Sequence, residues 1–350
     1  MSKPTPLPPG AVIGILGGGQ LGRMLSVAAS RLGYRSHIYE PGAAPAGDVA
    51  AMVTNAPYED EAALTAFAAS VDVVTYEFEN VPAAALDAIE AVVPIHPNRR
   101  ALAISQDRAD EKAFLNALGL ATAPWARVDD GAGLAAAVAR LGLPSILKTR
   151  RLGYDGKGQH RLTEGAALPE VAAPSVLEGF VDFSCEISVI VARGRDGSVA
   201  AYDPGLNVHR DGILRTTTLP CGLPAGLVTD AVLIASRIVS ALDYVGVMGV
   251  ELFVTPGGLL VNEVAPRVHN SGHWTQLGCV VDQFEQHIRA VAGLPLGSGR
   301  RHCDVVMENL IGDDMDRLPD LLRAEGVQLH LYGKAETRSG RKMGHVNRLA

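Results

Sequence analysis

Two glutamates in the middle of the chain, Glu251 and Glu263, have the residue type and the spacing to hold a divalent cation. Both lie in apolar segments, GVELFV and LLVNEV, which are typical of the two strands of a hairpin. A three-residue loop at 256–258 would place the two carboxylates directly opposite each other on one face. Close carboxylates repel unless a cation lies between them, and magnesium that bridges ATP phosphates is such a cation. The alternative is a pair of solvated acids on an exposed hairpin.

A loop rich in glycine and basic residues follows the apolar strand segment that ends at Lys148. Its sequence is RRLGYDGKGQ at 150–159. Glycines allow such a loop to cover a polyphosphate, and Lys148 and Lys157 could neutralise the phosphate charge. The spacing is not that of a P-loop, and a solvated hairpin turn is the alternative.

A second glycine loop, Gly17 to Gly22, contains G-x-G-x-x-G directly after the apolar segment AVIGIL. Glycines at this place let backbone amides approach a phosphate at a helix N-terminus. Glu40 lies 18 residues after Gly22, close to where a dinucleotide fold keeps its ribose-binding acid. The residues leave three interpretations open: a phosphate loop, an NAD site, or a turn that only packs a helix on a strand.

Two later segments are rich in polar groups. The loop RVHNSGHW at 267–274 suits a polar substrate, although one of its histidines could be structural. The segment from Lys334 to Arg348 holds five basic residues against one acid, Glu336, in an otherwise acidic chain. It is a candidate phosphate anchor, and a solvated basic tail is the alternative. Serine-hydrolase and zinc-hydrolase motifs are absent from the sequence.

The sequence patterns around these residues predict two different architectures along the chain. Over the first hundred residues, apolar segments alternate with helical patterns, which predicts right-handed crossovers and a doubly wound parallel sheet. A helix is expected from about Asp107 to Leu118. The middle of the chain, with its hairpins, is expected to be α+β. The last fifty residues contain one strand pattern, VQLHLYG, before the basic tail.

Composition narrows the class of protein. The chain has 350 residues, which is enough for two or three domains. Its net charge of -7 argues against general nucleic-acid binding, which needs a basic surface. No apolar run approaches the roughly 20 residues of a membrane helix, and the N-terminus lacks a signal-peptide pattern. The four cysteines form no CxxC pair. We therefore expect a cytoplasmic protein with no nucleic-acid and no membrane partner.

Nine segments, in order along nearly the whole chain, resemble the N5-carboxyaminoimidazole ribonucleotide synthase family of ATP-grasp ligases. The segments are GILGGGQLGRM, TYEFENVP, QDR at 106–108, KTRRLGYDGKGQ, LEGFVDFSCEIS, NVHRDGIL, GVELF, NEVAPRVHNSGHWT and GKAETRSGRKMGH. The resemblance implies an ATP-grasp fold with three domains. These are a Rossmann-like N-terminal domain at 1–105, an ATP-grasp domain at 106–295 with a small lid at about 120–182, and a C-terminal domain at 296–350 that completes the substrate site.

The resemblance also implies which residues meet each ligand. ATP would contact Arg108, Lys148, Gly153, Tyr154, Asp155, Gly156, Lys157, Gly158, Gln159, Glu178, Gly179, Phe180, Val181, Glu186, His209, Asn262 and Glu263. Magnesium would be held by Glu251 and Glu263. The ribonucleotide would contact Gln20, Glu77, Tyr154, Arg267, His269, Asn270, Lys334, Arg341 and Lys342. Among these, Arg267 would orient bicarbonate, and Tyr154 and His269 would orient the aminoimidazole.

The implied reaction joins bicarbonate to the amine of 5-aminoimidazole ribonucleotide. ATP would activate bicarbonate as carboxyphosphate, and the products would be N5-carboxyaminoimidazole ribonucleotide, ADP and phosphate, in purine biosynthesis. Magnesium is required and no organic cofactor is. The resemblance further implies a homodimer and a functional link to a carboxymutase. The first glycine loop would then serve the substrate.

Three positions depart from the family pattern: Leu152 and Leu206 replace a common glycine and a common acid, and Ala265 replaces an asparagine. Three other functions stay open. A formate-using glycinamide ribonucleotide transformylase shares most of the nucleotide contacts. An NAD-linked oxidoreductase would use G-x-G-x-x-G and Glu40. A non-catalytic nucleotide sensor is the third.

Overall fold

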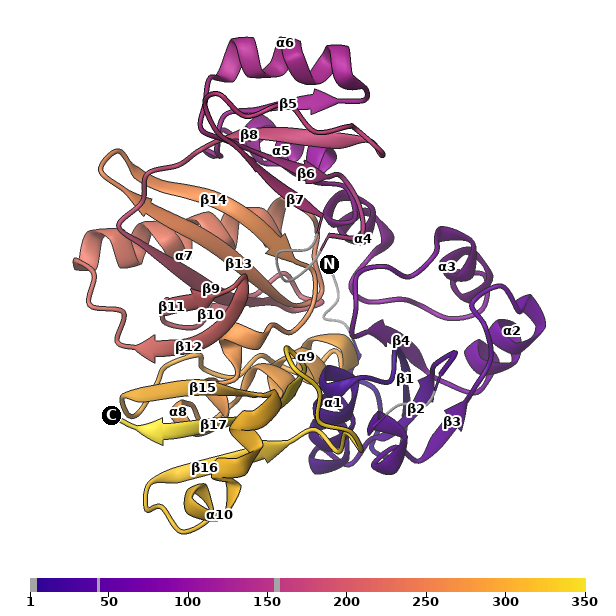
Figure 1. The fold of residues 1–350 in the computed structure, drawn as a ribbon. Helices are drawn as coiled ribbons and strands as arrows, with labels where there is room; N and C mark the ends of the chain where they lie inside the picture. The colour runs from indigo at the N-terminus through magenta and orange to yellow at the C-terminus, as the bar shows by residue number, and fades with distance from the viewer. Residues whose placement is uncertain (1–4, 43–44, 154–157) are drawn as a thin grey trace.

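Three β-sheets make up the framework of this computed structural model, which describes residues 5–42, 45–153 and 158–350 (Figure 1). The N-terminal sheet is parallel, with the strand order β3-β2-β1-β4. Its elements are β1 (Val12–Leu16), α1 (Gln20–Arg31), β2 (Arg35–Tyr39), η1 (Pro45–Asp48), β3 (Met52–Thr54), α2 (Glu61–Ala69), β4 (Val73–Tyr76) and α3 (Ala83–Glu90). The predicted parallel sheet is confirmed. Strands β1 and β4 are largely apolar and mostly buried, as expected when both faces are covered.

Two helices lead from this sheet into the middle of the chain: α4 (Arg99–Ser105) and α5 (Arg108–Ala117). The helix expected from Asp107 to Leu118 is α5 with its two cap residues. The Asp107 side chain accepts hydrogen bonds from the amides of Ala109 and Asp110, and so begins the helix at Arg108.

A second, antiparallel sheet has the strand order β5-β8-β6-β7 and carries one helix. Its elements are β5 (Trp125–Val128), α6 (Gly131–Leu141), β6 (Ser145–Thr149), β7 (Gln159–Leu162) and β8 (Ser175–Gly179). Leu134 and Ala137 of α6 pack with Leu147 and Leu177 in a small core of their own. Figure 1 shows this unit at the top of the molecule.

The third sheet has nine strands in the order β14-β13-β9-β11-β12-β15-β17-β16, with β10 paired to β9. Its strands are β9 (Cys185–Arg193), β10 (Val199–Ala201), β11 (Gly205–Arg210), β12 (Ile213–Leu219), β13 (Gly246–Thr255), β14 (Gly258–Ala265), β15 (Val305–Ile311), β16 (Val327–Leu331) and β17 (Lys342–Leu349). The three C-terminal strands therefore continue the central sheet, because β15 pairs with β12.

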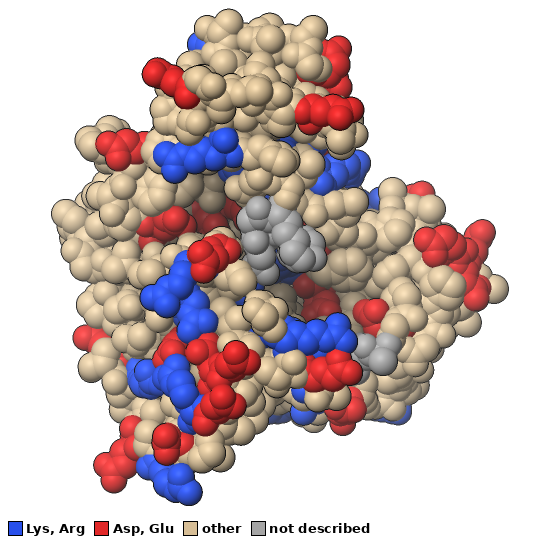
Figure 2. Space-filling model, viewed as in Figure 1, with Lys and Arg blue, Asp and Glu red and all other residues tan. Residues whose placement is uncertain are grey.

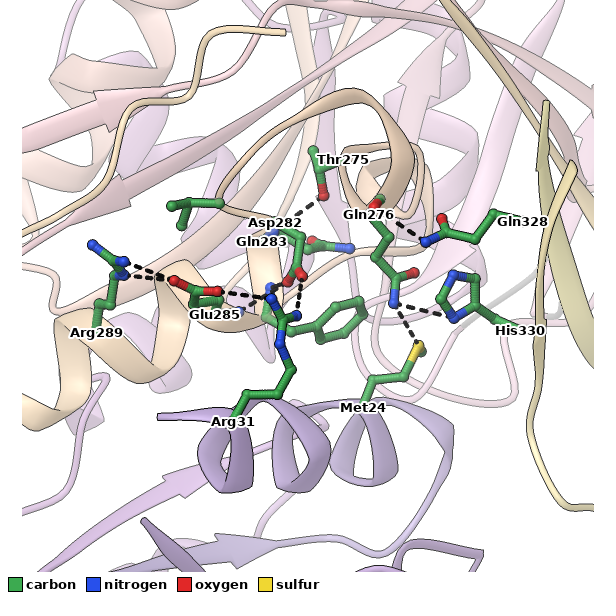
Figure 3. A network of polar contacts seen from close by, with 12 residues as sticks. Met24, Arg31, Thr275, Gln276, Asp282, Gln283, Glu285, Arg289, Gln328 and His330 are labelled. Carbon is green, nitrogen blue, oxygen red and sulfur yellow. Dashed lines mark hydrogen bonds and ion pairs between the residues drawn. The ribbon is translucent and has the colours of Figure 1, made fainter. Parts of the chain in front are cut away.

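Helices cover this sheet and connect it to the N-terminal one. They are α7 (Ala225–Ala241), η2 (Asn270–Gly272), α8 (Thr275–Gly278), α9 (Gln283–Ala292), η3 (Gly312–Arg317) and α10 (Leu318–Leu321). Helix α9 packs on β13 and β9 and also against α1. Arg31 of α1 is 3.2 Å from both Asp282 and Glu285 at the start of α9 (Figure 3). None of the described helices is both long and apolar enough to cross a membrane.

The hairpin of β13 and β14 confirms the predicted register but not the predicted loop. Glu251 is paired with Glu263. However, Thr255 pairs with Gly258, so the turn has two residues and the three-residue loop was wrong. A β-bulge after Glu251 takes up the difference, with Asn262 as the extra residue.

Candidate active site

A cavity of about 620 Å³ is lined by residues of the second and third sheets and of the segments that follow β1 and β4. Figure 2 shows both acidic and basic side chains around the hollow of this face. Most of the predicted site residues line it: Gln20, Glu77, Arg108, Lys148, Gly153, Gln159, Glu186, His209, Glu251, Asn262, Glu263, Arg267, His269, Asn270 and Lys342. Tyr154, Asp155, Gly156 and Lys157 lie outside the described residues. Segments that are far apart in sequence thus converge on one site.

The two carboxylates of the hairpin face each other in this cavity. Successive strand residues normally point to opposite faces, but the bulge lets Asn262 and Glu263 both line it. Burial and the charge of Glu263 raise the pKa of Glu251 to about 7. Burial also acts to raise the pKa of Glu263, but Arg108, 2.9 Å away, outweighs it and lowers that pKa to about 2.

This donor set fits a magnesium ion. Within the described ranges no group of three or more His, Cys, Asp or Glu side chains could hold a metal, and Ala265 offers no ligand. Magnesium commonly binds one or two carboxylates and keeps water and phosphate oxygens as its other ligands. Burial and the charge of Glu263 disfavour the ionised form of Glu251, so a cation between the two carboxylates would stabilise that form.

The predicted ATP contact Glu178 lies in a buried ion-pair triad. It is only 3% exposed, and its carboxylate is 2.9 Å from Lys148 Nζ and 3.2 Å from Lys112 Nζ. Burial acts to raise the pKa of Glu178, but the two ammonium groups outweigh it and lower the pKa. Glu178 therefore holds Lys148, whose side chain lines the cavity. Sequence reasoning missed Lys112, which belongs to no motif.

An apolar surface lies near these charges. Phe183 and Phe253 stack with ring centroids 4.5 Å apart, and both line the cavity together with Ile146. Sequence reasoning missed both phenylalanines. Such a flat pair suits an aromatic base.

The neighbouring segment 179–181 contributes less to the cavity. The Gly179 amide donates to Pro124 O and the Phe180 amide to Pro144 O. Phe180 is exposed, and the Arg161 guanidinium lies 4.8 Å from its ring centroid. Val181 is half-buried. The amides of Gly179 and Phe180 are therefore already used by the protein.

The loop RRLGYDGKGQ at 150–159 is described by the structure only at its two ends. Leu152 adopts a φ of 63°, the left-handed region that favours glycine. This explains why a glycine is common at the position. At the other end, a Cβ on Gly158 would lie 2.6 Å from Thr149 Oγ1, so the loop must return to β6 at a glycine.

Glu186 and His209 form a further pair, with Glu186 Oε2 2.8 Å from His209 Nδ1. Burial acts to lower the pKa of His209, but the hydrogen bond and charge of Glu186 outweigh it and raise the pKa. The pair joins β9 to β11 at the wall of the cavity.

The first glycine loop holds two carboxylates of the protein itself. Glu77 accepts hydrogen bonds from the amides of Gly19 and Gly22, the latter at 2.6 Å. Glu40 accepts from the amide of Gly18 at 2.8 Å. The amides that could receive a phosphate are therefore occupied, and the NAD interpretation loses its pyrophosphate site. The glycines are needed because a Cβ on Gly19 would lie 2.5 Å from Glu77 Oε1.

Arg267 pairs with a residue that sequence reasoning did not assign to the site. Its Nε is 2.5 Å and its Nη2 3.1 Å from the two oxygens of Glu79. Glu79 lies in the segment TYEFENVP, which was the available signal. A two-point pair of this kind fixes the plane of the guanidinium.

The loop after Arg267 presents two further groups to the cavity. Burial, together with the charge of Arg267, lowers the pKa of His269 to about 3, so its ring is neutral. The amide nitrogen and oxygen of Asn270 are buried and lack a hydrogen-bond partner among the described residues. Because such groups are costly to leave unpaired, Asn270 is well suited to a polar ligand.

The basic tail divides into two parts. Lys334 Nζ donates to Lys342 O at 2.7 Å, and burial and the charges of Arg341 and Lys342 lower the pKa of Lys334 to about 8. Lys342 lines the cavity, whereas the Arg341 guanidinium donates to Glu336 O at 3.0 Å.

The other two basic residues of the tail form ion pairs with acidic side chains. Arg338 pairs with Glu336, and Arg348 is 3.0 Å from Glu308. Lys334, Arg341 and Lys342 therefore form a cluster of like charges, which an anion would stabilise.

Comparisons with known proteins identify the family of the chain. Three family models match: the ribonucleotide synthetase preATP-grasp domain at 11–106, the ATP-grasp domain at 113–284, and the phosphoribosylaminoimidazole carboxylase C-terminal domain at 305–350. The N5-carboxyaminoimidazole ribonucleotide synthase of Brucella melitensis is 55% identical and covers 99% of this chain and 98% of that relative. The enzyme of the same name from Pseudomonas aeruginosa is 44% identical and covers 95% and 93%.

Solved structures point the same way. An ADP complex of an N5-carboxyaminoimidazole ribonucleotide synthetase superposes with a TM-score of 0.95 at 40% identity, over 99% of this chain and 94% of that one. The Aspergillus clavatus synthase in complex with ADP and 5-aminoimidazole ribonucleotide gives 0.91 at 30% identity, over 98% and 94%. The chain belongs to the N5-carboxyaminoimidazole ribonucleotide synthase family of ATP-grasp ligases.

Proposed function

We propose that this cavity carboxylates the amine of 5-aminoimidazole ribonucleotide, using ATP and bicarbonate, and releases N5-carboxyaminoimidazole ribonucleotide, ADP and phosphate. One observation carries the proposal. The carboxylate pair Glu251 and Glu263 lines the same cavity as the loop Arg267–Asn270. A γ-phosphate held beside the carboxylates is thereby next to an acceptor held by the loop.

ATP is assigned to the part of the cavity between β6 and the hairpin of β13 and β14. Lys148, held by Glu178, and Arg108 neutralise phosphate charge. The stacked rings of Phe183 and Phe253 offer an apolar surface to the base. Glu251 and Glu263 would hold magnesium, which when bound neutralises phosphate charge and polarises the transferred phosphoryl group.

The acceptor of the phosphoryl group is bicarbonate. Bicarbonate is a poor electrophile, and its phosphorylation gives carboxyphosphate and ADP. The substrate amine then attacks the carboxyl carbon, and phosphate leaves. Arg267, whose plane is fixed by Glu79, orients the bicarbonate and stabilises charge that develops on its oxygens. The protein supplies positions and charges and no covalent nucleophile.

The ribonucleotide is assigned to the side of the cavity formed by α1 and β17. Lys334, Arg341 and Lys342 bind its 5′-phosphate. Gln20 and Glu77 face its sugar, and Asn270 supplies the buried amide for its polar groups.

Tyr154 and the loop around it complete this assignment on the basis of the family resemblance, together with Gly153 to Gln159 as a cover that excludes water. We also propose the domain division 1–105, 106–295 and 296–350, with the lid at about 120–182. Its boundaries lie close to the three matched family models.

The setting of the enzyme is part of the proposal. A cytoplasmic location agrees with four cysteines that are all free. A homodimer is expected, and light scattering on the purified protein tests it directly. The product is a carbamate, a class of compound that loses CO2 readily, so a carboxymutase that consumes it without delay is the expected functional partner.

The test is phosphate release with ATP, bicarbonate and 5-aminoimidazole ribonucleotide, with each omitted in turn. We expect full turnover only with all three present. Stimulation by formate with no effect of bicarbonate would instead identify a transformylase.

A further inference from the structure

The His269 ring lies between two buried serines and the carboxylate pair. Its Nδ1 is 2.8 Å from Ser271 Oγ, and its Nε2 is 3.6 Å from Glu251 Oε1. The ring packs on Gly249, where a Cβ would lie 2.7 Å from the Cβ of His269. One nitrogen of the ring therefore faces the protein interior and the other faces the carboxylates of the cavity.

The serines form a short chain of hydroxyl groups behind the ring. Ser188 on β9 is paired in register with Glu251 on β13, so their side chains share a face of the sheet. Ser188 Oγ lies 2.7 Å from Ser271 Oγ. Ser188 and Ser271 are 2% and 0% exposed, so water does not compete for these hydrogen bonds.

The direction of this chain follows from the backbone. The Ser271 amide also points at His269 Nδ1, at 3.4 Å, and an amide N–H can only donate. Nδ1 must therefore present its lone pair, and the Ser271 hydroxyl donates to it as well. The oxygen of Ser271 is then free to accept the hydroxyl proton of Ser188. In a neutral imidazole the single N–H must consequently be at Nε2.

The backbone around the ring is held as well. Gln283, which is 0% exposed, accepts from His269 N at 2.9 Å and donates to His269 O at 2.7 Å. The backbone N–H of Gln283 donates to Thr275 Oγ1 at 3.0 Å (Figure 3). A ring fixed through its own backbone and through Nδ1 has little freedom to turn or flip.

We propose that Ser188 and Ser271 are positioning residues that hold His269 as the Nε2–H tautomer. His269 then donates a hydrogen bond to a negatively charged oxygen of the bicarbonate-derived group and does not serve as the base that takes the proton of the substrate amine. The inference rests on the proposed function for the identity of that oxygen. It rests on the geometry alone for the tautomer.

A base at this position would need a lone pair on the nitrogen that faces the cavity. Nε2 has none, because Nδ1 is committed to two donors. Protonating Nδ1 to release Nε2 would place an N–H against the Ser271 amide. The ring would become positively charged when Nε2 then took the proton of the amine, and burial and the neighbouring Arg267 disfavour that charge.

The tautomer can be tested in the ligand-free protein. Long-range proton–nitrogen correlation spectra of ¹⁵N-histidine protein report which ring nitrogen carries the proton, and the His269 signals are identified by their loss in His269→Gln. We expect a protonated Nε2 and an unprotonated Nδ1 in the wild type, and a mixture of both tautomers in Ser271→Ala. A protonated Nδ1 in the wild type overturns the inference.

Kinetics separate positioning from a merely structural role. Ser271→Ala should lower kcat for carboxylation by about tenfold to a hundredfold, as expected for loss of a buried hydrogen bond that acts in the transition state, while KM for ATP changes less than about twofold. Ser188→Ala should lower kcat less. The matched control is Ser26→Ala, which removes a buried hydroxyl without a partner among the described residues and should leave both constants unchanged.

An unchanged kcat in correctly folded Ser271→Ala, with an unchanged histidine spectrum, would contradict the inference. If Ser271→Ala does not fold, the spectrum and kcat of Ser188→Ala decide in the same way. Wild-type protein without bicarbonate-dependent carboxylation would refute the proposed function. The spectrum of the ligand-free protein would still decide the tautomer.

Discussion

Glu251 and Glu263 lie directly opposite each other on β13 and β14, although the turn that joins these strands is one residue too short for that register. The β-bulge at Asn262 supplies the missing residue. It also turns Asn262 and Glu263 toward the same cavity. The pair of carboxylates thus depends on an irregularity of the strand, which links the local backbone to the proposed metal site.

Replacing Glu263 by glutamine should lower turnover on the order of a hundredfold or more, because one of the two charges that would hold magnesium is removed. Folding should survive, since the repulsion between the two carboxylates is relieved, although the ion pair of Glu263 with Arg108 is lost. Glu61→Gln, at an exposed position on α2, is the matched control. Near-normal turnover of Glu263→Gln at saturating magnesium would show that this carboxylate is not a metal ligand.

Replacing Lys342 by alanine should raise KM for the ribonucleotide by roughly tenfold to a thousandfold, since a charged contact to its phosphate is lost. KM for ATP should barely change. Arg338→Ala removes a basic residue of the same tail that is exposed and paired with Glu336, and should leave both constants alone. If Lys342→Ala raised KM for ATP instead, the tail would belong to the nucleotide site.

The ribonucleotide affinity should fall as pH rises through about 8. Burial and two neighbouring cations lower the pKa of Lys334 to about 8 in the free protein, so its charge is present below that pH and is lost above it. A phosphate monoester with a pKa near 6 stays dianionic over this range. We expect KM for the ribonucleotide to rise several-fold, up to about tenfold, between pH 7 and 9.5.

Arginine remains charged at every pH used in this measurement. The variant Lys334→Arg should therefore show a much flatter pH profile of KM. A wild-type profile without the rise, or the same rise in Lys334→Arg, would speak against a role of Lys334 in phosphate binding.

Glu111 should make the fold less stable as pH rises. Its carboxyl is 3% exposed and accepts from the Val264 amide, and burial and the charge of Glu263 raise its pKa to about 8. A raised folded-state pKa gives stability that is complete below the unfolded value, near 4.5, and is lost as pH rises through about 8. Glutamine keeps the acceptor and cannot ionise.

The free energy of unfolding of Glu111→Gln should therefore equal that of the wild type near pH 4.5 and exceed it near pH 9. Each unit of the pKa shift corresponds to about 1.4 kcal/mol, so the difference should be on the order of a few kcal/mol. Denaturant titrations at the two pH values measure it. Parallel pH profiles for the two proteins would show that Glu111 is ionised in the fold throughout.

Local sequence patterns were sufficient to predict several secondary-structure elements and part of the site. The parallel N-terminal sheet and the helix capped by Asp107 follow from periodicity and cap residues, and the facing of Glu251 and Glu263 was predicted correctly but from a wrong loop length. The loop length did not, because a bulge at Asn262 and a shorter turn give the same register as a regular hairpin with a longer one.

Hydrogen bonds and ion pairs between residues far apart in the sequence could not be predicted from the residues. Glu79 is 188 positions from Arg267, and Glu77 is 58 positions from Gly19, so neither pairing leaves a pattern in a local window. The glycine loop was predicted to serve the substrate, and only the fold reveals that its amides hold Glu77 and Glu40 while Gln20 lines the cavity. Glu178 was assigned to ATP from its motif, and only the fold reveals the buried Lys112 beside it.

The most direct test of the account follows oxygen from bicarbonate. Wild-type protein is given ATP, ¹⁸O-labelled bicarbonate and 5-aminoimidazole ribonucleotide, and the released phosphate is analysed by mass spectrometry. Transfer of the phosphoryl group to a bicarbonate oxygen, followed by attack of the amine, predicts one labelled oxygen in the phosphate for each ribonucleotide carboxylated. Phosphate without the label, formed at the same rate whether or not the ribonucleotide is carboxylated, would contradict the proposed reaction.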